Sequence, residues 1–115
     1  MSRHIGIVMD PIDTINPKKD STFAMMLAAA RKGWRISVMT LSNLSLRQDQ
    51  FWARYQTITV QDDPNHYYDL VSDHEGGPEA FDVILMRKDP PFNMDYIYAT
   101  YLLEFAERAG VPVFN

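Results

Sequence analysis

The stretch "DVILMRKDPPFN" at residues 82–93 joins three features that decide the fold. Residues 83–86 form a short apolar run, which is typical of a strand buried in a sheet. The run ends in the charged residues Arg87, Lys88 and Asp89, and two prolines then restrict the backbone. Asn93 follows as a candidate N-cap for a helix. The stretch therefore predicts a core strand, a rigid charged connection and a helix.

A strand and a helix are also predicted at the start of the chain. Residues 4–9, "HIGIVM", form an apolar run that predicts a strand, and two prolines within residues 10–20 predict a loop after it. Asp20 or Ser21 can cap the helix that follows, and Gly33 is its expected end. The buried face of this helix is expected to consist of apolar residues at helical spacing, which are Phe23, Met26, Leu27 and Ala30.

The order of strand and helix repeats along the chain. Residues 35–41, "RISVMTL", predict a second strand, and residues 111–115, "VPVFN", begin a last one after Gly110 ends the second helix. The positions expected to face the core in that helix are Met94, Ile97, Tyr98, Tyr101, Leu102 and Phe105. This order predicts an α/β domain whose mostly parallel sheet is flanked by helices and whose crossovers are right-handed.

The middle of the chain has a different pattern. Residues 44–60 contain two β-prone runs around the polar turn at residues 48–50, which predicts a β-hairpin. Its aromatic residues Phe51, Trp52 and Tyr55 are expected either to cover the core or to contact a partner subunit. The polar and acidic residues 61–80 predict mostly loop, with a short helix at residues 67–71. If this chain forms a homo-oligomer, as the family resemblance described below implies, the hairpin at residues 44–60 is our candidate interface.

Length and composition limit the classes of protein to which the chain can belong. Its 115 residues suit a single domain, and no apolar run approaches the ~20 residues that span a bilayer. The 11 basic and 15 acidic residues give a net charge of −4, so we expect no nucleic-acid or membrane partner. The chain has no cysteine, which excludes disulfides and is compatible with the cytoplasm, its expected location.

Charged and polar residues gather where the predicted strands end. In open α/β sheets, ligands bind beyond the carboxyl ends of the strands, so residues from distant segments should meet there. These residues, which we call the strand-end cluster, are the predicted substrate-binding residues: Asp10, Lys18, Lys19, Asp20, Ser21, Arg87, Lys88 and Asp89. They include lysines just before a helix N-terminus, where a bound anion would be stabilised.

Each charge in the cluster also has a structural interpretation. Lys18 and Lys19 can be solvated loop residues offset by Asp20, because exposed charges need no ligand to explain them. Arg87 can fork onto a carboxylate or phosphate, and it can equally pair with Asp89 or Asp10. The two prolines, Pro90 and Pro91, would hold these side chains in place or simply lead rigidly into the helix.

Several common functional motifs are missing from the sequence. The five glycines form neither a GxGxxG nor a GxxxxGK phosphate-binding loop, and no serine lies in a nucleophile elbow. His66 and His74 lie among acidic residues, but their spacing matches no strong metal motif, so a solvated acidic loop is the favoured interpretation. His4 opens a strand and is expected to be structural. We predict no catalytic, cofactor-binding or metal-binding residue in this chain.

Four stretches together resemble a known family. They are "GIVMDPI" (6–12), "INPKKDSTFAMM" (15–26), "DVILMRKDPPF" (82–92) and "YIYATYLLE" (96–104), and they resemble the N-terminal domain of bacterial glutathione synthetase. The resemblance covers nearly the whole chain and is weakest at residues 61–80. It implies a Rossmann-like, pre-ATP-grasp domain with an added β-hairpin. It also implies a cytoplasmic homo-oligomer.

The resemblance further implies a part in an ATP-dependent ligase. Such an enzyme joins γ-glutamylcysteine to glycine through an acyl-phosphate and uses ATP and Mg²⁺. Its ATP and Mg²⁺ ligands lie in two following ATP-grasp domains, which are missing from this chain. Residues 1–115 would then be a single N-terminal domain, cut from a longer protein and inactive alone. The strand-end cluster would form one wall of the γ-glutamylcysteine site, because its mixed charges suit a zwitterion with two carboxylates.

Two other functions are weighed against this one. A stand-alone α/β module for anion binding or oligomerisation is an alternative, because a fold alone does not fix a function. A phosphoacceptor receiver domain shares the α/β layout but needs an acidic pair after the first strand. Here Asp10 is followed by Pro11, which disfavours it.

Overall fold

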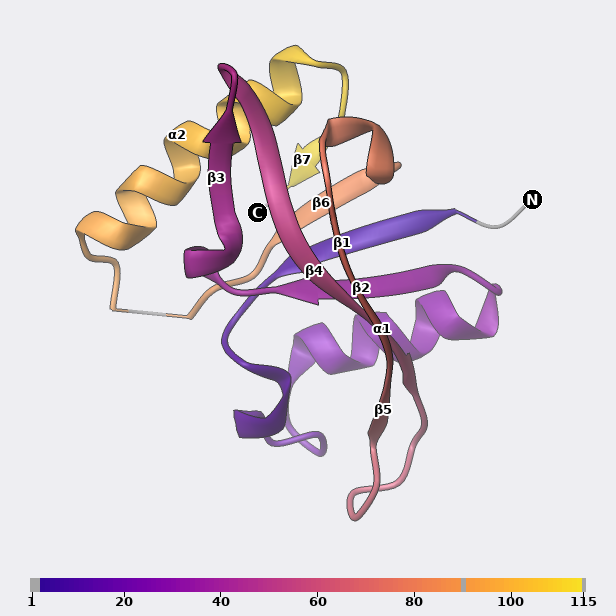
Figure 1. Cartoon of the computed structure of the whole chain (residues 1–115). Helices are drawn as coiled ribbons and strands as arrows, with labels where there is room; N and C mark the ends of the chain where they lie inside the picture. The colour runs from indigo at the N-terminus through magenta and orange to yellow at the C-terminus, as the bar shows by residue number, and fades with distance from the viewer. Residues whose placement is uncertain (1–2, 90, 115) are drawn as a thin grey trace.

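The computed structural model describes residues 3–89 and 91–114 of the chain. Seven strands form one sheet (Figure 1), and they are β1 (His4–Val8), β2 (Arg35–Met39), β3 (Leu44–Arg47), β4 (Gln50–Val60), β5 (Tyr68–Gly76), β6 (Val83–Met86) and β7 (Val113–Phe114). The two α-helices are α1 (Ser21–Arg31) and α2 (Met94–Arg108). Short 3₁₀ turns lie at Ile12–Thr14, Leu41–Asn43 and Pro78–Ala80. Pro90 and Asn115, which entered the sequence predictions, lie outside the described residues.

The sheet has a parallel part and an antiparallel part. Strands β2, β1, β6 and β7 are parallel neighbours in that order, as the alternation of strands and helices predicts. Strand β4 runs antiparallel to β2, and both β3 and β5 pair antiparallel with β4. The predicted α/β fold with parallel strands and flanking helices is therefore confirmed, and the antiparallel part extends one strand beyond the expected hairpin.

Strand β4 links the two parts because its long backbone pairs with three strands. Ala53 faces Leu44 of β3 on one edge and Gly76 of β5 on the other. Farther along, Ile58 lies between Ile36 of β2 and Leu70 of β5. Strands β3 and β2 consequently share one edge of β4, one after the other, while β5 lines the opposite edge. The length of β4 relative to β2 and β3 is visible in Figure 1.

The helices cover opposite faces of the sheet, and each face has its own core. On the α1 side, Phe23 and Met26 pack among apolar residues of β1 and β2. On the α2 side, Leu102 and Ala106 pack with Phe51 of β4 and with β6. Successive residues of a strand point to opposite faces, so the continuous apolar run in β1 supplies both cores.

The predicted helix ends are confirmed. The Asp20 side chain accepts a hydrogen bond from the Phe23 amide at 2.9 Å, and the Asn93 side chain accepts one from Tyr96 at 3.2 Å. These caps satisfy amide groups that have no partner within the helix. Gly33 follows α1 with a φ of 77°, a left-handed conformation that suits a residue without Cβ.

The predicted loop at residues 61–80, with its short helix at residues 67–71, is wrong. Residues 68–76 form β5, which pairs along most of β4. Apart from partly covered positions at its ends and at Ser72, this strand is exposed, so its sequence lacks the apolar alternation that would mark a strand. The acidic side chains suit an unprotected sheet edge, because charge discourages pairing with other chains.

The buried face of α2 also differs from the prediction. The helix buries Ala99, Leu102, Leu103 and Ala106, while the predicted core positions Met94, Ile97, Tyr98 and Tyr101 are exposed. The buried face thus combines two leucines with two alanines, and the sequence prediction missed it by ranking the larger side chains first. In α1, similarly, Ala29 is buried and Ala30 is exposed. Within the described residues, neither helix has the length and hydropathy needed to cross a bilayer.

Candidate functional site

The carboxyl ends of three parallel strands meet at one edge of the sheet. Val8, the last residue of β1, lies opposite Met39 of β2 and Met86 of β6. The Arg87 amide also donates to the Val8 carbonyl at 2.8 Å, which continues the pairing past the end of β6. Residues that follow these strands therefore emerge side by side, as the sequence predicts for Asp10, Arg87 and Lys88.

Asp10 and Lys88 form an ion pair at this edge. The Lys88 Nζ lies 3.0 Å from the Asp10 Oδ1, and only 18% of the lysine side chain is exposed. The same ammonium donates to the Asp89 carbonyl at 2.6 Å, so its position is fixed by two contacts. Restricted solvent access makes this pair less sensitive to salt than a surface pair.

Arg87 points to the first turn of α1 rather than to an acidic residue. Its Nε donates to the Thr22 hydroxyl and a terminal nitrogen donates to the Ser21 hydroxyl, both at 3.1 Å. Within residues 3–89 and 91–114 it makes no ion pair, so the alternative of a bridge to Asp10 or Asp89 is wrong. The positive charge of the guanidinium is thus not neutralised by these neutral hydroxyls. The guanidinium and the N-terminus of α1 would both attract an anion.

The other cluster residues lie around this point with less definite roles. Lys18 and Lys19 are exposed in the turn before α1, and the Lys18 amide donates to the Asn16 side chain at 3.1 Å. Asp20 is engaged as the cap of α1, and Asp89 is exposed. The structure therefore joins Asp10 with Lys88 and Arg87 with Ser21, while Lys18 and Lys19 extend into solvent.

Two clefts open on either side of Asp10. The larger, of about 560 Å³, runs between β1 and the start of α2 and is lined by Asp10, Thr40, Lys88, Asn93 and Tyr98, among others. The smaller, of about 260 Å³, lies toward β5 and includes Asp13, Thr40, Asn43, Gln56 and Tyr68. Both volumes approach or reach the size of small-molecule sites.

Thr40 and Asn43, which line the smaller cleft, were missed by the sequence reasoning. The Thr40 amide donates to the Asn43 side chain at 2.9 Å, and the Asn43 amide donates to the Thr40 carbonyl at 3.0 Å. This reciprocal arrangement fixes the 3₁₀ turn after β2. The threonine and asparagine three residues apart, directly after a predicted strand, were a usable signal for a turn at the strand ends.

Tyr67 fastens the loop after β1 to the start of β5. Its hydroxyl donates to the Ile12 carbonyl at 2.7 Å, and its ring meets Phe23 edge to face. Burial, followed by the charges of the Tyr68 phenolate and the Asp13 carboxylate, raises the pKa of Tyr67 above its ordinary value of 10.0. The phenol therefore stays protonated and donates across the physiological range. It was missed because residues 61–80 were expected to be loop.

His4 has the structural role that the sequence predicts, whereas the acidic loop expected around His66 and His74 is wrong in part, because His74 lies in β5. His4 is buried, and its Nε2 lies 2.7 Å from the Ser37 hydroxyl. His66 is exposed and its Nε2 lies 2.6 Å from Asp69. In the part of the chain that the structure describes, no three His, Asp or Glu side chains converge in a way that could hold a metal ion.

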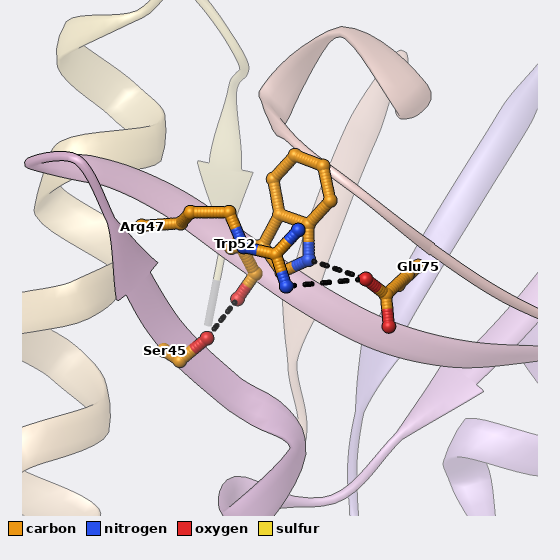
Figure 2. A network of polar contacts seen from close by, with 4 residues as sticks. All are labelled: Ser45, Arg47, Trp52 and Glu75. Atoms are coloured by element: carbon orange, nitrogen blue, oxygen red, sulfur yellow. Dashed lines mark hydrogen bonds and ion pairs between the residues drawn. The ribbon is translucent and has the colours of Figure 1, made fainter.

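The aromatic residues of the β3–β4 hairpin are divided between core and surface. Phe51 and Tyr55 are buried in the core on the α2 side, which confirms that they cover it. Trp52 is partly exposed, and the Arg47 Cζ lies 4.3 Å from the centroid of its ring. The Trp52 Nε1 donates to the Glu75 Oε1 at 3.4 Å (Figure 2). These contacts join β3, β4 and β5 on the outer face. The predicted interface on the hairpin stays a prediction, and of the three aromatic residues only Trp52 is partly exposed.

Comparison with known proteins identifies relatives of this chain. Residues 4–115 match the family described as prokaryotic glutathione synthetase, N-terminal domain. A glutathione synthetase of Vibrio vulnificus strain YJ016 is 49% identical over 111 residues, which are 96% of this chain and 35% of that protein. One of Pseudomonas syringae pv. tomato is 49% identical over 115 residues, which are 100% of this chain and 36% of that protein.

The matches cover nearly all of this chain but only part of each relative. The chain spans about a third of the length of the curated relatives that it matches. The family match covers almost every residue, including both segments of the strand-end cluster. The chain therefore belongs to the family of the prokaryotic glutathione synthetase N-terminal domain.

Proposed function

We propose that this chain is the substrate-side domain of an ATP-dependent ligase that joins γ-glutamylcysteine and glycine to make glutathione. The proposal rests on the family match together with the charges at the strand ends. The carboxyl ends of parallel strands are the usual ligand edge of such sheets, and two clefts lie there around Asp10. The segment alone is proposed to be inactive, with the rest of the active site in the part of such a ligase that this chain does not span.

The charged residues of the strand-end cluster would bind opposite charges of the zwitterionic dipeptide. Arg87 binds a carboxylate of the substrate with the guanidinium nitrogens that remain beside its bonds to Ser21 and Thr22. Lys18 and Lys19 add positive charge before α1, which attracts the same carboxylate. Asp10 is held by Lys88 and faces the cleft, where its second oxygen can accept from the substrate ammonium.

ATP and Mg²⁺ are proposed to bind in the remainder of the ligase and to activate the carboxylate there. The sequence of this segment has no phosphate-binding glycine loop. Its described side chains also offer no three-ligand group for a metal ion. The residues of this segment would therefore position the dipeptide and leave nucleotide binding to other domains. The protein is proposed to act in the cytoplasm as a homo-oligomer.

Replacing Arg87 in the full-length protein tests the dipeptide site. Arg87→Ala is expected to raise the KM for γ-glutamylcysteine about 10-fold or more, because a charge-assisted hydrogen bond is lost. Arg31→Ala, at the exposed other end of α1, is the matched control and should leave the KM unchanged. An unchanged KM together with a lower Tm for Arg87→Ala would make Arg87 a structural residue.

An NMR titration of the 115-residue chain separates this proposal from a stand-alone module. γ-Glutamylcysteine and Mg-ATP are added separately while the amide signals are followed. Shifts near Lys18, Asp20 and Arg87 with the dipeptide alone support a substrate wall within this segment. Equal shifts with inorganic phosphate would instead favour the alternative of a general anion-binding module. No shift with any ligand would mean that the segment has no binding site of its own.

A further inference from the structure

The loop between β1 and α1 carries much of the strand-end cluster, namely Asp10, Lys18, Lys19 and Asp20. Both ends of this loop are fixed by the neighbouring elements. The Met9 amide donates to the Met39 carbonyl of β2 at 2.9 Å, and the Asp20 side chain caps α1. Between these ends, the regular structure in residues 11–17 is the 3₁₀ turn Ile12–Thr14. The position of Asp10 therefore depends on what holds this turn against the rest of the domain.

The bonds within the turn fix its shape but not its place. The Thr14 amide and hydroxyl both donate to the Pro11 carbonyl, at 2.9 Å and 2.6 Å. The Ile12 side chain is buried and packs in the core on the α1 side. Apolar packing is non-directional, so it sets the position of the turn less closely than a hydrogen bond does. A hydrogen bond from another element would fix that position.

Tyr67, just before β5, makes such a bond. Its hydroxyl donates to the Ile12 carbonyl at 2.7 Å, although the two residues are 55 positions apart in the chain. Within residues 3–89 and 91–114, no other hydrogen bond joins residues 11–17 to a segment outside the loop. The loop and the turn between β4 and β5 lie together at the lower end of Figure 1. Tyr67 therefore fixes the middle of the loop.

Tyr67 is itself held in place, so it can act as a fixed point. Its carbonyl accepts a hydrogen bond from the Gln61 amide at 3.0 Å, which closes the turn between β4 and β5. Its ring meets the ring of Phe23 in α1 edge to face, with the centroids 5.5 Å apart. Burial raises the pKa of Tyr67, so the phenol stays protonated and remains a donor at neutral pH.

The bond to Ile12 affects Asp10 through a single intervening residue. Pro11 lies between them, and its ring restricts the backbone there, with a φ of −51°. A displacement of the turn is therefore passed on to Asp10 instead of being absorbed by backbone rotation. Asp10 lines both clefts, and its carboxylate lies 3.0 Å from Lys88. The carboxylate is thus placed by the lysine on one side and by the held turn on the other.

We propose that Tyr67 is a positioning residue for the dipeptide site, which holds the turn at Ile12–Thr14 and thereby keeps Asp10 in place to accept from the substrate ammonium. The inference rests on the proposed function, which assigns that ammonium to Asp10. It adds a residue from outside the strand-end cluster. Tyr67 lines neither of the two clefts around Asp10, so it acts through Asp10 and not by touching the substrate.

Removing the Tyr67 hydroxyl in the full-length ligase tests the inference. Tyr67→Phe keeps the ring against Phe23 and removes the bond to Ile12. We expect the KM for γ-glutamylcysteine to rise about 3- to 10-fold, the usual effect of one lost hydrogen bond. The kcat and the KM for Mg-ATP should change by less than about 2-fold, because Tyr67 contacts no reacting group. A lower Tm with an unchanged KM for the dipeptide would make Tyr67 a structural residue only and overturn the inference.

Tyr55→Phe is the matched control. Tyr55 also packs in a core beside β5, but on the α2 side, and its hydroxyl makes no hydrogen bond within the described residues. Its substitution should leave both KM values unchanged. An equal rise of the KM for the dipeptide in the two variants would indicate a general loss of packing and overturn the inference.

A second substitution tests the route through Asp10. In Asp10→Ala, the carboxylate that Tyr67 positions is gone, so adding Tyr67→Phe should raise the KM for the dipeptide by less than a further 2-fold or about that. A second rise as large as in the otherwise natural protein would mean that Tyr67 acts on another part of the site. That result would overturn the inference.

Arg87→Ala separates this inference from the proposed function. If Arg87→Ala raises the KM for the dipeptide and Tyr67→Phe does not, the site is present but Tyr67 does not position it. If neither variant raises it, the proposed function fails, and the inference fails with it.

Hydrogen exchange in the 115-residue chain tests the hold on the turn without any substrate. The Thr14 amide should exchange at least about 3-fold faster in Tyr67→Phe, because local opening of the turn becomes easier. The Ile7 amide in β1 is the internal control and should exchange at an unchanged rate. Equal exchange of the Thr14 amide in the natural chain and the variant would mean that Tyr67 does not hold the turn.

Discussion

The parallel and antiparallel parts of the sheet bury their residues in different ways. All five residues of β1 are buried, whereas β5 has none that is fully buried among its nine. The parallel part is covered by a helix on each face. Strand β5 is an edge strand that pairs only with β4, so its other edge is open to water. Strand β4 belongs to both parts, since it alternates between buried and exposed residues until the register shifts at Thr57 and Ile58. Stability should therefore depend on β1, β4 and β6, and hardly on β5.

The largest expected effect tests whether the antiparallel part is integral to the core. Phe51 of β4 and Phe23 of α1 are both almost fully buried, on opposite faces of the sheet. Phe51→Ala and Phe23→Ala should each lower the free energy of unfolding by about 3–5 kcal/mol, because each leaves a large cavity. Urea denaturation of the 115-residue chain measures both. A loss of under about 1.5 kcal/mol for Phe51→Ala alone would make the hairpin a peripheral addition.

A pair of glycines gives the next comparison. A Cβ on Gly6 of β1 would lie 2.7 Å from a carbon of the Phe81 ring and 2.8 Å from the end of Met39. Gly6→Ala should cost about 1–3 kcal/mol, since a well-packed core resists an added methyl group. On Gly76 of β5, the nearest atom would be the Ala80 Cβ at 3.4 Å.

Gly76→Ala is the matched control for Gly6→Ala, and its thermal unfolding should show little change or a gain of up to about 1 kcal/mol. The gain would come from restricting the unfolded chain. If both variants lost the same stability, β5 would be packed as tightly as β1, and the contrast between the two parts would be wrong.

This contrast also explains how much the sequence could predict. The strands of the parallel part are mostly apolar, and Asp20, Asn93 and Gly33 mark the helix ends, so local chemistry was sufficient there. The turn at Gln48 and Asp49 was found from its polarity, although both residues adopt a positive φ that asparagine and glycine favour more strongly. Strand β5 was missed because its own residues lack a strand pattern. Its conformation comes from pairing with β4, which local sequence does not reveal.

The candidate site was predictable in position but not in detail. The rule for strand ends brought Asp10, Arg87 and Lys88 to one edge, as the structure has them. It could not select among partners, and Arg87 meets two hydroxyls of α1 instead of a carboxylate. The buried face of α2 was predicted wrongly because the apolar residues of this helix extend over more than one face. Only packing against the sheet decides between them.

His4 tests the polar link between the two parts. It connects β1 through Ser37 of β2 to Thr57 of β4, with the two hydroxyls 3.0 Å apart. Its Nδ1 must donate to the Ala80 carbonyl, so the neutral ring accepts from Ser37 through Nε2. Protonation makes Nε2 a donor, and the Ser37 hydroxyl must then turn toward Thr57.

The pKa of His4 determines the direction of the pH effect. Burial lowers it from the ordinary 6.5, and Arg35 and His74 act in the same direction, while the Ala80 carbonyl and Asp82 oppose them. The folded chain then binds fewer protons than the unfolded chain, so stability is lost as pH falls from about 6.5 toward the folded pKa. The loss is at most about 1.4 kcal/mol for each pH unit between the two values. NMR titration of the His4 ring measures the folded pKa; a midpoint at 6.5 would mean no pH effect, and one above 6.5 would reverse the expected sign.

The smallest effects compare one ion pair from each part. Asp10 and Lys88 lie partly buried at the end of β1, whereas Arg47 and Glu75 are about half exposed on the antiparallel part, with their oxygen and nitrogen 3.2 Å apart (Figure 2). Asp10→Asn should cost about 1 kcal/mol, because Lys88 loses the partner that compensates for its burial. Glu75→Gln should cost about 0.5 kcal/mol or less, since an exposed pair gains little.

The salt dependence of the two variants should differ more than the expected losses of stability themselves. Raising the ionic strength from about 0.01 M to 1 M shortens the screening distance from about 30 Å to 3 Å. The cost of Glu75→Gln should then vanish, while most of the cost of Asp10→Asn should remain, because its lysine is largely shielded from solvent. Urea denaturation at the two salt concentrations measures both. Equal screening would mean that the strand-end pair is as open to solvent as the surface pair, and that Asp10 and Lys88 are free to separate when a charged ligand arrives.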